Sequence, residues 1–209
     1  MEFKIITPEK VDSPEYLRAW DIYLESFAER DTKSLNIIMK LLKGNPAYKL
    51  FVDIIDKYIV GIGLASFYPV DKVAFIDYIG ISKNFHGRGI ELFIETELKK
   101  YSDKLGCKYL FIEIDRNAIK NGLNGYTKLQ VITDIQYRIP PCRNNGTWKE
   151  GMLGILSDEK IESIPLDYVK KIVSRIYKEI YFNMDDMPLN KIFNNVIDRS
   201  VLKVSFFSP

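Results

Sequence analysis

One stretch of the sequence constrains the fold more than any other: residues 73–100, VAFIDYIGISKNFHGRGIELFIETELKK. It is typical of a buried strand that runs into a short loop, His86-Gly87-Arg88-Gly89, from which a helix starts at once. The first turn of a helix has unpaired N–H groups that point at one spot, where the helix dipole also favours negative charge. Gly87 and Gly89 would let a phosphate approach the main chain, and Arg88 would add a cation. The sequence therefore predicts an anion site in this loop.

The segments on either side of the loop predict a mixed α/β sheet. Three successive strands are expected to form an antiparallel meander: Tyr48–Ile55, Tyr58–Tyr68 and Val73–Ile81. The two residues Asp56-Lys57 are a hairpin signal between the first two of them. A helix of about Gly89–Leu105, with Leu92, Phe93 and Leu98 inward, then leads to a strand at Tyr109–Asp115. A crossover of this length requires parallel pairing, so the sheet has an antiparallel front half and one parallel step.

The N-terminal part predicts a strand at Phe3–Thr7 and two helices. The first helix is expected to begin with Ser13 as its N-cap and Pro14 at its first position. Its apolar residues recur at helical spacing and predict one buried face: Leu17, Trp20, Leu24 and Phe27. The second helix is expected at about Thr32 to Lys43.

The C-terminal part is less regular. Strands are expected at Gln130–Ile139 and, as the last of the sheet, Met152–Leu156. An amphipathic pattern predicts a helix from Pro165 to about Phe182 that packs on the domain. The final apolar segment, VLKVSFF, fits either an added strand or a dimer contact, and a homodimer is left open.

Composition narrows the function classes. Lys+Arg of 30 against Asp+Glu of 28 gives a formal net charge of +2, so no nucleic-acid partner is indicated. No apolar run approaches the ~20 residues that span a bilayer, and no signal-peptide pattern opens the chain, so no membrane partner and a cytoplasmic location are expected. A single histidine and the distant Cys107 and Cys142 predict no metal site and no disulfide framework.

The order of these elements, with the motif IGISKNFHGRGIE at Ile79–Glu91, resembles the GNAT acetyltransferase superfamily. That family's acyl-CoA motif has the form [Q/R]-x-x-G-x-[G/A] after a strand. His86 stands in the Gln/Arg place, Gly89 in the glycine place and Glu91 in the final place, so two of three positions depart, while Gly87 and Ile90 match the common RGxGIG form. A carboxylate at Glu91 would repel a pyrophosphate unless it points outward.

The resemblance implies a fold, a co-substrate and a set of contacts. The fold would have a splayed parallel pair and helices on both faces, with residues 1–160 as the acetyltransferase domain and 161–209 as a helical extension packed on it. Acetyl-CoA would be the co-substrate. Its pyrophosphate would bind the loop and its pantetheine arm would pair with the preceding strand. The implied contacts are Ile79, Gly80, Ile81, His86, Gly87, Arg88, Gly89, Ile90 and Glu91.

Three residues are candidates for catalysis. The segment NGYTKLQV is similar to the family's FYEKLGF segment, which places Tyr126 on the tyrosine that often protonates the departing thiolate. Asp77 and Glu113 interrupt two apolar strands that are predicted neighbours, so they are expected to converge on the acceptor site, where partial burial would suit a general base. The alternative for each carboxylate is a solvent-facing position on a half-exposed strand.

The resemblance implies an N-acetyltransferase that moves the acetyl group directly to a primary amine of a small molecule or peptide in a ternary complex. The departures at His86 and Glu91 keep a second hypothesis open, a catalytically silent CoA-binding sensor or interaction module. A P-loop nucleotide binder is excluded, because no GxxxxGK[S/T] motif occurs.

Overall fold

The computed structural model describes the chain except residues 28–31, 116–128, 143–146, 183–191, 197–198 and 207–209. By its internal contacts the chain divides into two compact units. The first comprises Met1–Phe67, Ile76–Gly106 and Cys142–Asn144, and the second comprises Tyr68–Phe75, Cys107–Pro141 and Asn145–Pro209.

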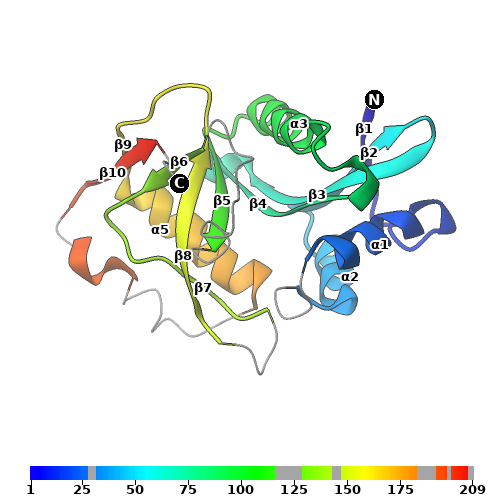
Figure 1. The fold of residues 1–209 in the computed structure, drawn as a ribbon. Helices are drawn as coiled ribbons and strands as arrows, with labels where there is room; N and C mark the ends of the chain where they lie inside the picture. Colours follow the sequence, from blue (N-terminus) through cyan, green and yellow to red (C-terminus); the bar gives the residue numbers. More distant parts are fainter. Residues whose placement is uncertain (28–31, 116–128, 143–146, 183–191, 197–198, 207–209) are drawn as a thin grey trace. The chain divides into compact units, whose positions relative to one another are not determined.

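The first unit is a sheet with helices on both faces (Figure 1). Its strands are β1 (Glu2–Ile6), β2 (Tyr48–Ile55), β3 (Tyr58–Tyr68) and the larger part of β4 (Val73–Ile81). Its helices are α1 (Leu17–Ser26), α2 (Leu35–Gly44) and α3 (Ile90–Lys104), with short 3₁₀ turns at Pro14–Tyr16 and Lys83–Phe85. Antiparallel registers join β1 to β2 and β2 to β3.

The two faces of this sheet can be told apart by its glycines. A Cβ at Gly61 or Gly63 of β3 would lie 2.8 Å or 3.3 Å from Ile94 of α3, so that helix packs closely on the glycines of this face. A Cβ at Gly80 of β4 would lie 2.9 Å from Ser26 Oγ of α1 and 3.1 Å from Ile62, which alternates with Gly61 and Gly63. Helix α1 therefore covers the opposite face.

The second unit is an antiparallel sheet with one long helix. Its strands are β5 (Tyr109–Asp115), β6 (Leu129–Ile132), β7 (Arg138–Ile139), β8 (Lys149–Leu156), β9 (Ser163–Pro165) and β10 (Val201–Phe206). Helix α5 (Leu166–Arg175) continues into a π-helical turn, Ile176–Ile180; single 3₁₀ turns lie at Pro69–Asp71 and Asn194–Val196. Strand β8 pairs with β5, β6 and β7.

The strand order is β1-β2-β3-β4-β5-β8-β6-β10-β9, with β7 beside β8. Among the described strands the pairs are mostly antiparallel, and one pair is parallel, as predicted for β4 and β5. The two strands meet at their beginnings, within the second unit, where the N–H of Lys108 donates to the carbonyl of Lys72 at 2.7 Å. Strand β4 then passes into the first unit at Ile76.

The meander was predicted correctly, because its strands are bounded by strong turn signals. Strands β2, β3, β4 and β5 have the expected bounds. Asp56 and Lys57 both have positive φ, of 48° and 71°, as a tight type I′ hairpin requires. The final segment proves to be an added strand, because β10 pairs with β6 and β9 of the same chain.

Several local predictions need correction. Ser13 is an N-cap and Pro14 stands at the first position, as predicted, but of a 3₁₀ turn, and the Ser13 side chain makes no capping hydrogen bond. Helix α1 starts only at Leu17. This offset turns Leu17 and Leu24 outward and buries Ala19, Ile22 and Tyr23 beside Trp20. Likewise Leu92 of α3 is exposed, while Ile90, Ile94 and Leu98 form its buried stripe.

Two strand predictions in the second unit also need correction. The segment 130–139 is not one strand: β6 ends at Ile132 and the short β7 starts at Arg138. Strand β8 begins three residues earlier than expected, at Lys149, and is not the last, because β9 and β10 follow. The domain boundary at residue 160 stays a prediction.

Candidate functional site

The loop between β4 and α3 adopts a backbone that glycine favours. Gly87 and Gly89 have φ of 72° and 76°, in the left-handed region that residues with a Cβ rarely enter. A Cβ at either position would meet no atom within 4 Å. These glycines are therefore needed for conformation, and they leave open space beside the main chain.

Three successive N–H groups at the end of this loop have no hydrogen-bond acceptor in the described part of the chain. Among the described residues, none accepts a hydrogen bond from the main-chain N–H of Gly87, Arg88 or Gly89. Gly89 is the N-cap of α3 and has no side chain to satisfy the first helical N–H groups. Successive free N–H groups at the positive end of a 15-residue helix form an anion-binding arrangement.

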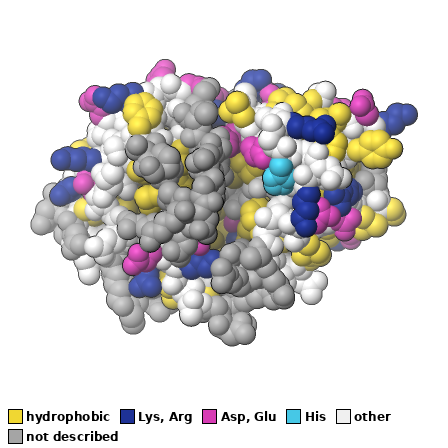
Figure 2. Space-filling view, in the orientation of Figure 1, with side chains coloured by type: hydrophobic (Ala, Val, Ile, Leu, Met, Phe, Trp, Pro, Cys, Tyr) yellow, Lys and Arg dark blue, Asp and Glu magenta, His cyan; other side chains and the backbone are white. Residues whose placement is uncertain are grey.

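Three side chains surround this arrangement. His86 Nε2 lies 3.0 Å from the carbonyl oxygen of Ile81, so the imidazole ties the loop to the end of β4. Its Nδ1 lies 4.0 Å from Glu91 Oε1 at the start of α3. The Arg88 guanidinium lies over the Phe85 ring, 5.1 Å from its centroid. His86, the chain's single histidine, is on the surface (cyan in Figure 2), so the loop faces solvent.

The end of β4 leads into the loop. Ile81 and Ile90 are buried in the core, and Gly80 is required by the close approach of α1. Asp77 and Ile79 are partly exposed as residues, yet the Asp77 side chain is only 1% exposed. The exposed part of Asp77 is therefore its main chain. Exposed main chain on a strand can pair with an extended ligand that lies along the strand.

The Asp77 carboxylate lies in a buried ion pair that the sequence did not predict. Lys33 Nζ is 2.8 Å from Oδ1, and the Tyr48 hydroxyl donates to Oδ2 at 2.5 Å. The Lys33 ammonium also lies 4.9 Å from the centroid of the Tyr78 ring, where cation–π attraction adds to the pair. Both carboxylate oxygens are thus engaged by groups from β2 and from the segment before α2.

An aromatic cluster encloses this pair. Tyr78 packs against Tyr23 and Phe27, each with ring centroids 5.0 Å from its own. The Tyr23 hydroxyl donates to the carbonyl of Lys33 at 3.0 Å. Burial raises the pKa of Tyr23 and Tyr78, with the Asp77 charge adding to the rise, so both stay protonated. Tyr23 and Phe27 therefore serve the packing around Lys33.

The Glu113 carboxylate, in the second unit, accepts two hydroxyl groups. Tyr137 donates to Oε1, and Tyr181 donates to Oε2 at 2.6 Å. Asp77 and Glu113 lie in different units, so their expected convergence stays a prediction. Tyr126 lies outside the described residues.

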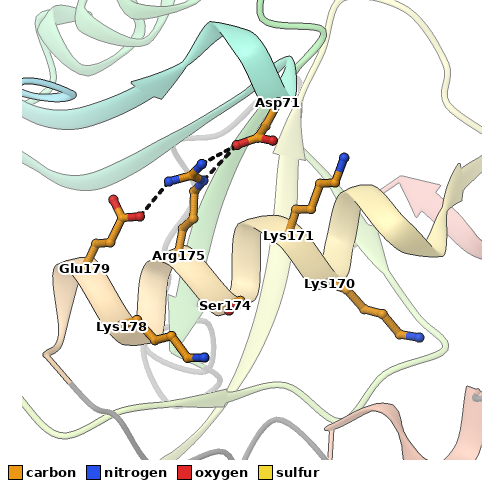
Figure 3. A pocket seen from close by; sticks show the side chains of 7 residues that line it. All are labelled: Asp71, Lys170, Lys171, Ser174, Arg175, Lys178 and Glu179. Carbon is orange, nitrogen blue, oxygen red and sulfur yellow. Dashed lines mark hydrogen bonds and ion pairs between the residues drawn. The ribbon is translucent and has the colours of Figure 1, made fainter.

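The helix α5 carries a pocket of a different kind, with a volume of about 450 Å³ (Figure 3). Arg175 donates to Asp71 at 2.5 Å and to Glu179 at 2.6 Å, and its guanidinium stacks on Tyr68. Lys170 and Lys178 extend away from this network (Figure 3). Since two carboxylates already neutralise Arg175, the network ties the turn at Asp71 to α5 and offers no reactive group.

No cluster of His, Cys, Asp or Glu in the described part of the chain could hold a metal ion. No helix in that part is long and apolar enough to cross a membrane. The loop at the N-terminus of α3 has N–H groups without acceptors among the described residues, and it follows a strand with exposed main chain. This arrangement suits an extended ligand that contains phosphate.

The sequence comparison identifies the class of protein. The model of the Acetyltransferase (GNAT) family matches residues 16–121, just over half of the chain. The chain therefore belongs to the GNAT acetyltransferase family, an acyltransferase family. No protein with a curated description matches the chain.

Solved structures agree on the fold. A protein from Bacteroides thetaiotaomicron described as a GNAT-family acetyltransferase has a TM-score of 0.68 at 14% identity, covering 87% of this chain and 98% of its own. A GNAT acetyltransferase from Elizabethkingia anophelis, solved with acetyl-CoA bound, has a TM-score of 0.52 at 16% identity, with coverages of 74% and 95%. An acetyltransferase from Bacillus subtilis in complex with CoA gives 0.52 at 14% identity, with the same coverages.

Proposed function

We propose that this protein transfers an acetyl group from acetyl-CoA to a primary amine of a small molecule or peptide, directly within a ternary complex. The observation that carries the proposal is the loop 86–91, whose unpaired N–H groups and left-handed glycines suit a pyrophosphate. Membership of the GNAT family supports the same assignment.

The co-substrate would bind along β4 and the loop. Its pyrophosphate would accept hydrogen bonds from the N–H groups of Gly87 to Glu91, and Arg88 would add charge at the rim. The pantetheine arm would pair with the main chain at Ile79 to Ile81. His86 would hold the loop against the strand end through its bond to Ile81.

Of the two candidate bases we favour Glu113. Both oxygens of Asp77 are engaged by Lys33 and Tyr48 in a fully buried pair, so a proton from substrate would have to break that pair. Glu113 is partly exposed, and the hydroxyls that Tyr137 and Tyr181 donate to it are neutral. We therefore propose Glu113 as general base, Asp77 as the anchor of Lys33 and Tyr126 as general acid.

One contact supports the alternative, a catalytically silent CoA-binding module. The Glu91 carboxylate stands at the positive end of α3, 4.0 Å from His86, where it competes with an incoming phosphate. Weak cofactor binding would follow from this contact, and a sensor tolerates weak binding better than an enzyme does.

An assay of thiol release separates the two functions. The protein is mixed with acetyl-CoA and a panel of primary amines, polyamines and peptides with free N-termini, and free CoA thiol is measured. Amine-dependent, saturable release supports the acetyltransferase. Saturable acetyl-CoA binding without release across the panel supports the silent module.

Tyr126→Phe tests the proposed general acid. Turnover is expected to fall while acetyl-CoA affinity stays nearly unchanged, because the hydroxyl would act on the leaving thiolate and not on the bound cofactor. An unaltered rate removes Tyr126 from the mechanism.

A further inference from the structure

Both oxygens of the Glu113 carboxylate are held by tyrosine hydroxyls from parts of the chain far from β5. Tyr137 precedes β7, and Tyr181 follows the π-helical turn after α5. The two donors are 24 and 68 residues away from Glu113 in sequence. A carboxylate that is bonded at both oxygens by residues of separate elements has one orientation.

Tyr137 belongs to a buried aromatic cluster and borders a cavity. Tyr137 is 2% exposed, and Tyr177, which packs between Tyr137 and Trp148, is fully buried. The Tyr177 hydroxyl donates to the carbonyl of Arg138 instead of to Glu113. Tyr137 also lines a cavity of about 280 Å³ together with Gln136, Arg138, Glu150 and Gly151. The residue whose hydroxyl bonds Glu113 thus also borders a cavity that is large enough for a small ligand.

We propose that Tyr137 and Tyr181 are positioning residues that fix the Glu113 carboxylate for proton transfer. This inference rests on the proposed function. The substrate ammonium gives a proton to Glu113, and the neutral amine then attacks the thioester carbon. The C–N bond forms, the C–S bond breaks, and the CoA thiolate leaves and takes up the proton that the nitrogen loses as it becomes the amide.

The two hydroxyls have a defined electrostatic effect. Each donates to the charged form of the carboxylate and stabilises it over the protonated form. They also hold the carboxylate in one orientation, which matters because proton transfer depends on alignment. Removing either hydroxyl is therefore expected to make Glu113 take up its proton at higher pH and to misalign it.

Other ionisable groups lie on the strands beside Glu113, and Glu150 and Arg138 line the cavity that Tyr137 borders. Asp115, two residues along β5, pairs with Lys149 of β8 at 3.3 Å. The residue opposite Glu113 on β8 is the apolar Leu153. Burial, and then the charge of Glu113, raise the pKa of Tyr177, so this tyrosine stays neutral, while Arg138 opposes the rise. Tyr137 and Tyr181 each donate a hydrogen bond directly to the Glu113 carboxylate.

The test compares Tyr137→Phe and Tyr181→Phe with Tyr177→Phe as the matched control. The control also removes a buried hydroxyl from the same aromatic cluster, but not one that touches Glu113. In the first two variants the acid limb of the kcat/KM profile is expected to move to higher pH, and kcat to fall roughly tenfold or more. In these two variants the KM for acetyl-CoA is expected to be unchanged. In Tyr177→Phe the acid limb of the kcat/KM profile is expected at the same pH as in the wild type.

A second measurement does not depend on turnover. The side-chain carboxyl signal of Glu113 is followed by ¹³C NMR against pH and assigned with Glu113→Gln. The pH midpoint of this titration is expected to rise in Tyr137→Phe and Tyr181→Phe and to be unchanged in Tyr177→Phe. Unchanged midpoints in both variants, or an equal change in the control, overturn the inference. If the wild type releases no thiol with any amine while the midpoints shift as expected, the proposed function fails and the hydrogen-bonding role alone stands.

Discussion

Two carboxylic acids, Asp53 and Glu95, are buried between the sheet and α3, and the described part of the chain gives no hydrogen-bond partner to Asp53 or to Oε1 of Glu95. Asp53 of β2 is fully buried, and neither of its oxygens has a hydrogen-bond partner within the described part of the chain. Burial raises the pKa of Asp53 to about 7, with the charge of Glu97 adding to the rise. Burial likewise raises the pKa of Glu95 to about 8, helped by Glu91. Helix α3 therefore packs on two carboxyl groups that hold their protons to a higher pH than exposed carboxyl groups do.

Asp53 makes stability depend on pH. Its folded pKa is above the unfolded value of about 4, so the folded chain holds a proton that the unfolded chain loses between these values. The stabilising contribution is complete below about pH 4 and is lost as the pH rises through 7; Glu95 extends the loss to about 8. In Asp53→Asn the difference in unfolding free energy between pH 5 and pH 8 is expected to shrink by roughly 2 kcal/mol.

Urea denaturation at the two pH values measures this difference. Asp21→Asn, at an exposed position on α1, is the control and should leave the pH dependence as it is. An Asp53→Asn variant with the wild-type pH dependence would show that Asp53 does not hold its proton in the folded state.

The Asp77–Lys33 pair gives a second prediction at the residue scale. Asp77→Asn removes the carboxylate that pairs with the buried Lys33 ammonium, and we expect a loss of about 3 kcal/mol in unfolding free energy. Replacing both residues, in Lys33→Met with Asp77→Leu, should recover most of that loss because no buried charge remains.

The turnover of the double variant shows whether Asp77 only anchors Lys33 or acts as the general base. The double variant is expected to retain turnover if Asp77 only holds Lys33. A stable double variant without turnover, at unchanged acetyl-CoA affinity, would return Asp77 to the role of base.

At the scale of elements, the loop conformation and the start of α3 depend on Gly89. Gly89→Ala places a Cβ at φ 76° and is expected to cost about 1 kcal/mol, with no steric clash because no atom lies within 4 Å. If the loop relaxes to avoid this strain, its N–H groups turn away from a common point. We expect acetyl-CoA affinity, measured by calorimetry, to fall about tenfold.

Gly44→Ala is the matched control for this variant. Gly44 ends α2, has no atom within 4 Å of a Cβ and has no left-handed φ. Its replacement should leave acetyl-CoA affinity unchanged and stability equal or slightly higher. Equal affinity of Gly89→Ala and wild type would contradict the role of the loop.

The sequence predicted elements best where local signals agree. Strands β2 to β5 end at turn residues such as Asp56-Lys57, so pattern and turn chemistry coincide. The first turn of α1 was mispredicted because Ser13 and Pro14 also suit a 3₁₀ turn, and the offset rotated the buried face. The break in 130–139 was missed because its apolar residues, Ile135 and Tyr137 among them, are buried without belonging to a strand.

At the scale of the whole molecule, the site residues come from distant parts of the chain. The glycine loop is contiguous and could be predicted from one stretch. Lys33, Tyr137 and Tyr181 could not, because their roles depend on contacts with Asp77 and Glu113 across 24 to 68 residues. A buried lysine or a tyrosine that bonds a carboxylate has no local sequence signal, and only the tertiary fold brings such partners together.

Amide hydrogen exchange tests whether the loop 86–91 binds the pyrophosphate of acetyl-CoA. Exchange of the main-chain amides of residues 87–91 is measured with and without saturating acetyl-CoA. We expect strong slowing at these amides, because N–H groups without acceptors in the described part of the chain would bond phosphate oxygens. Saturable binding with unchanged exchange in this loop would contradict it.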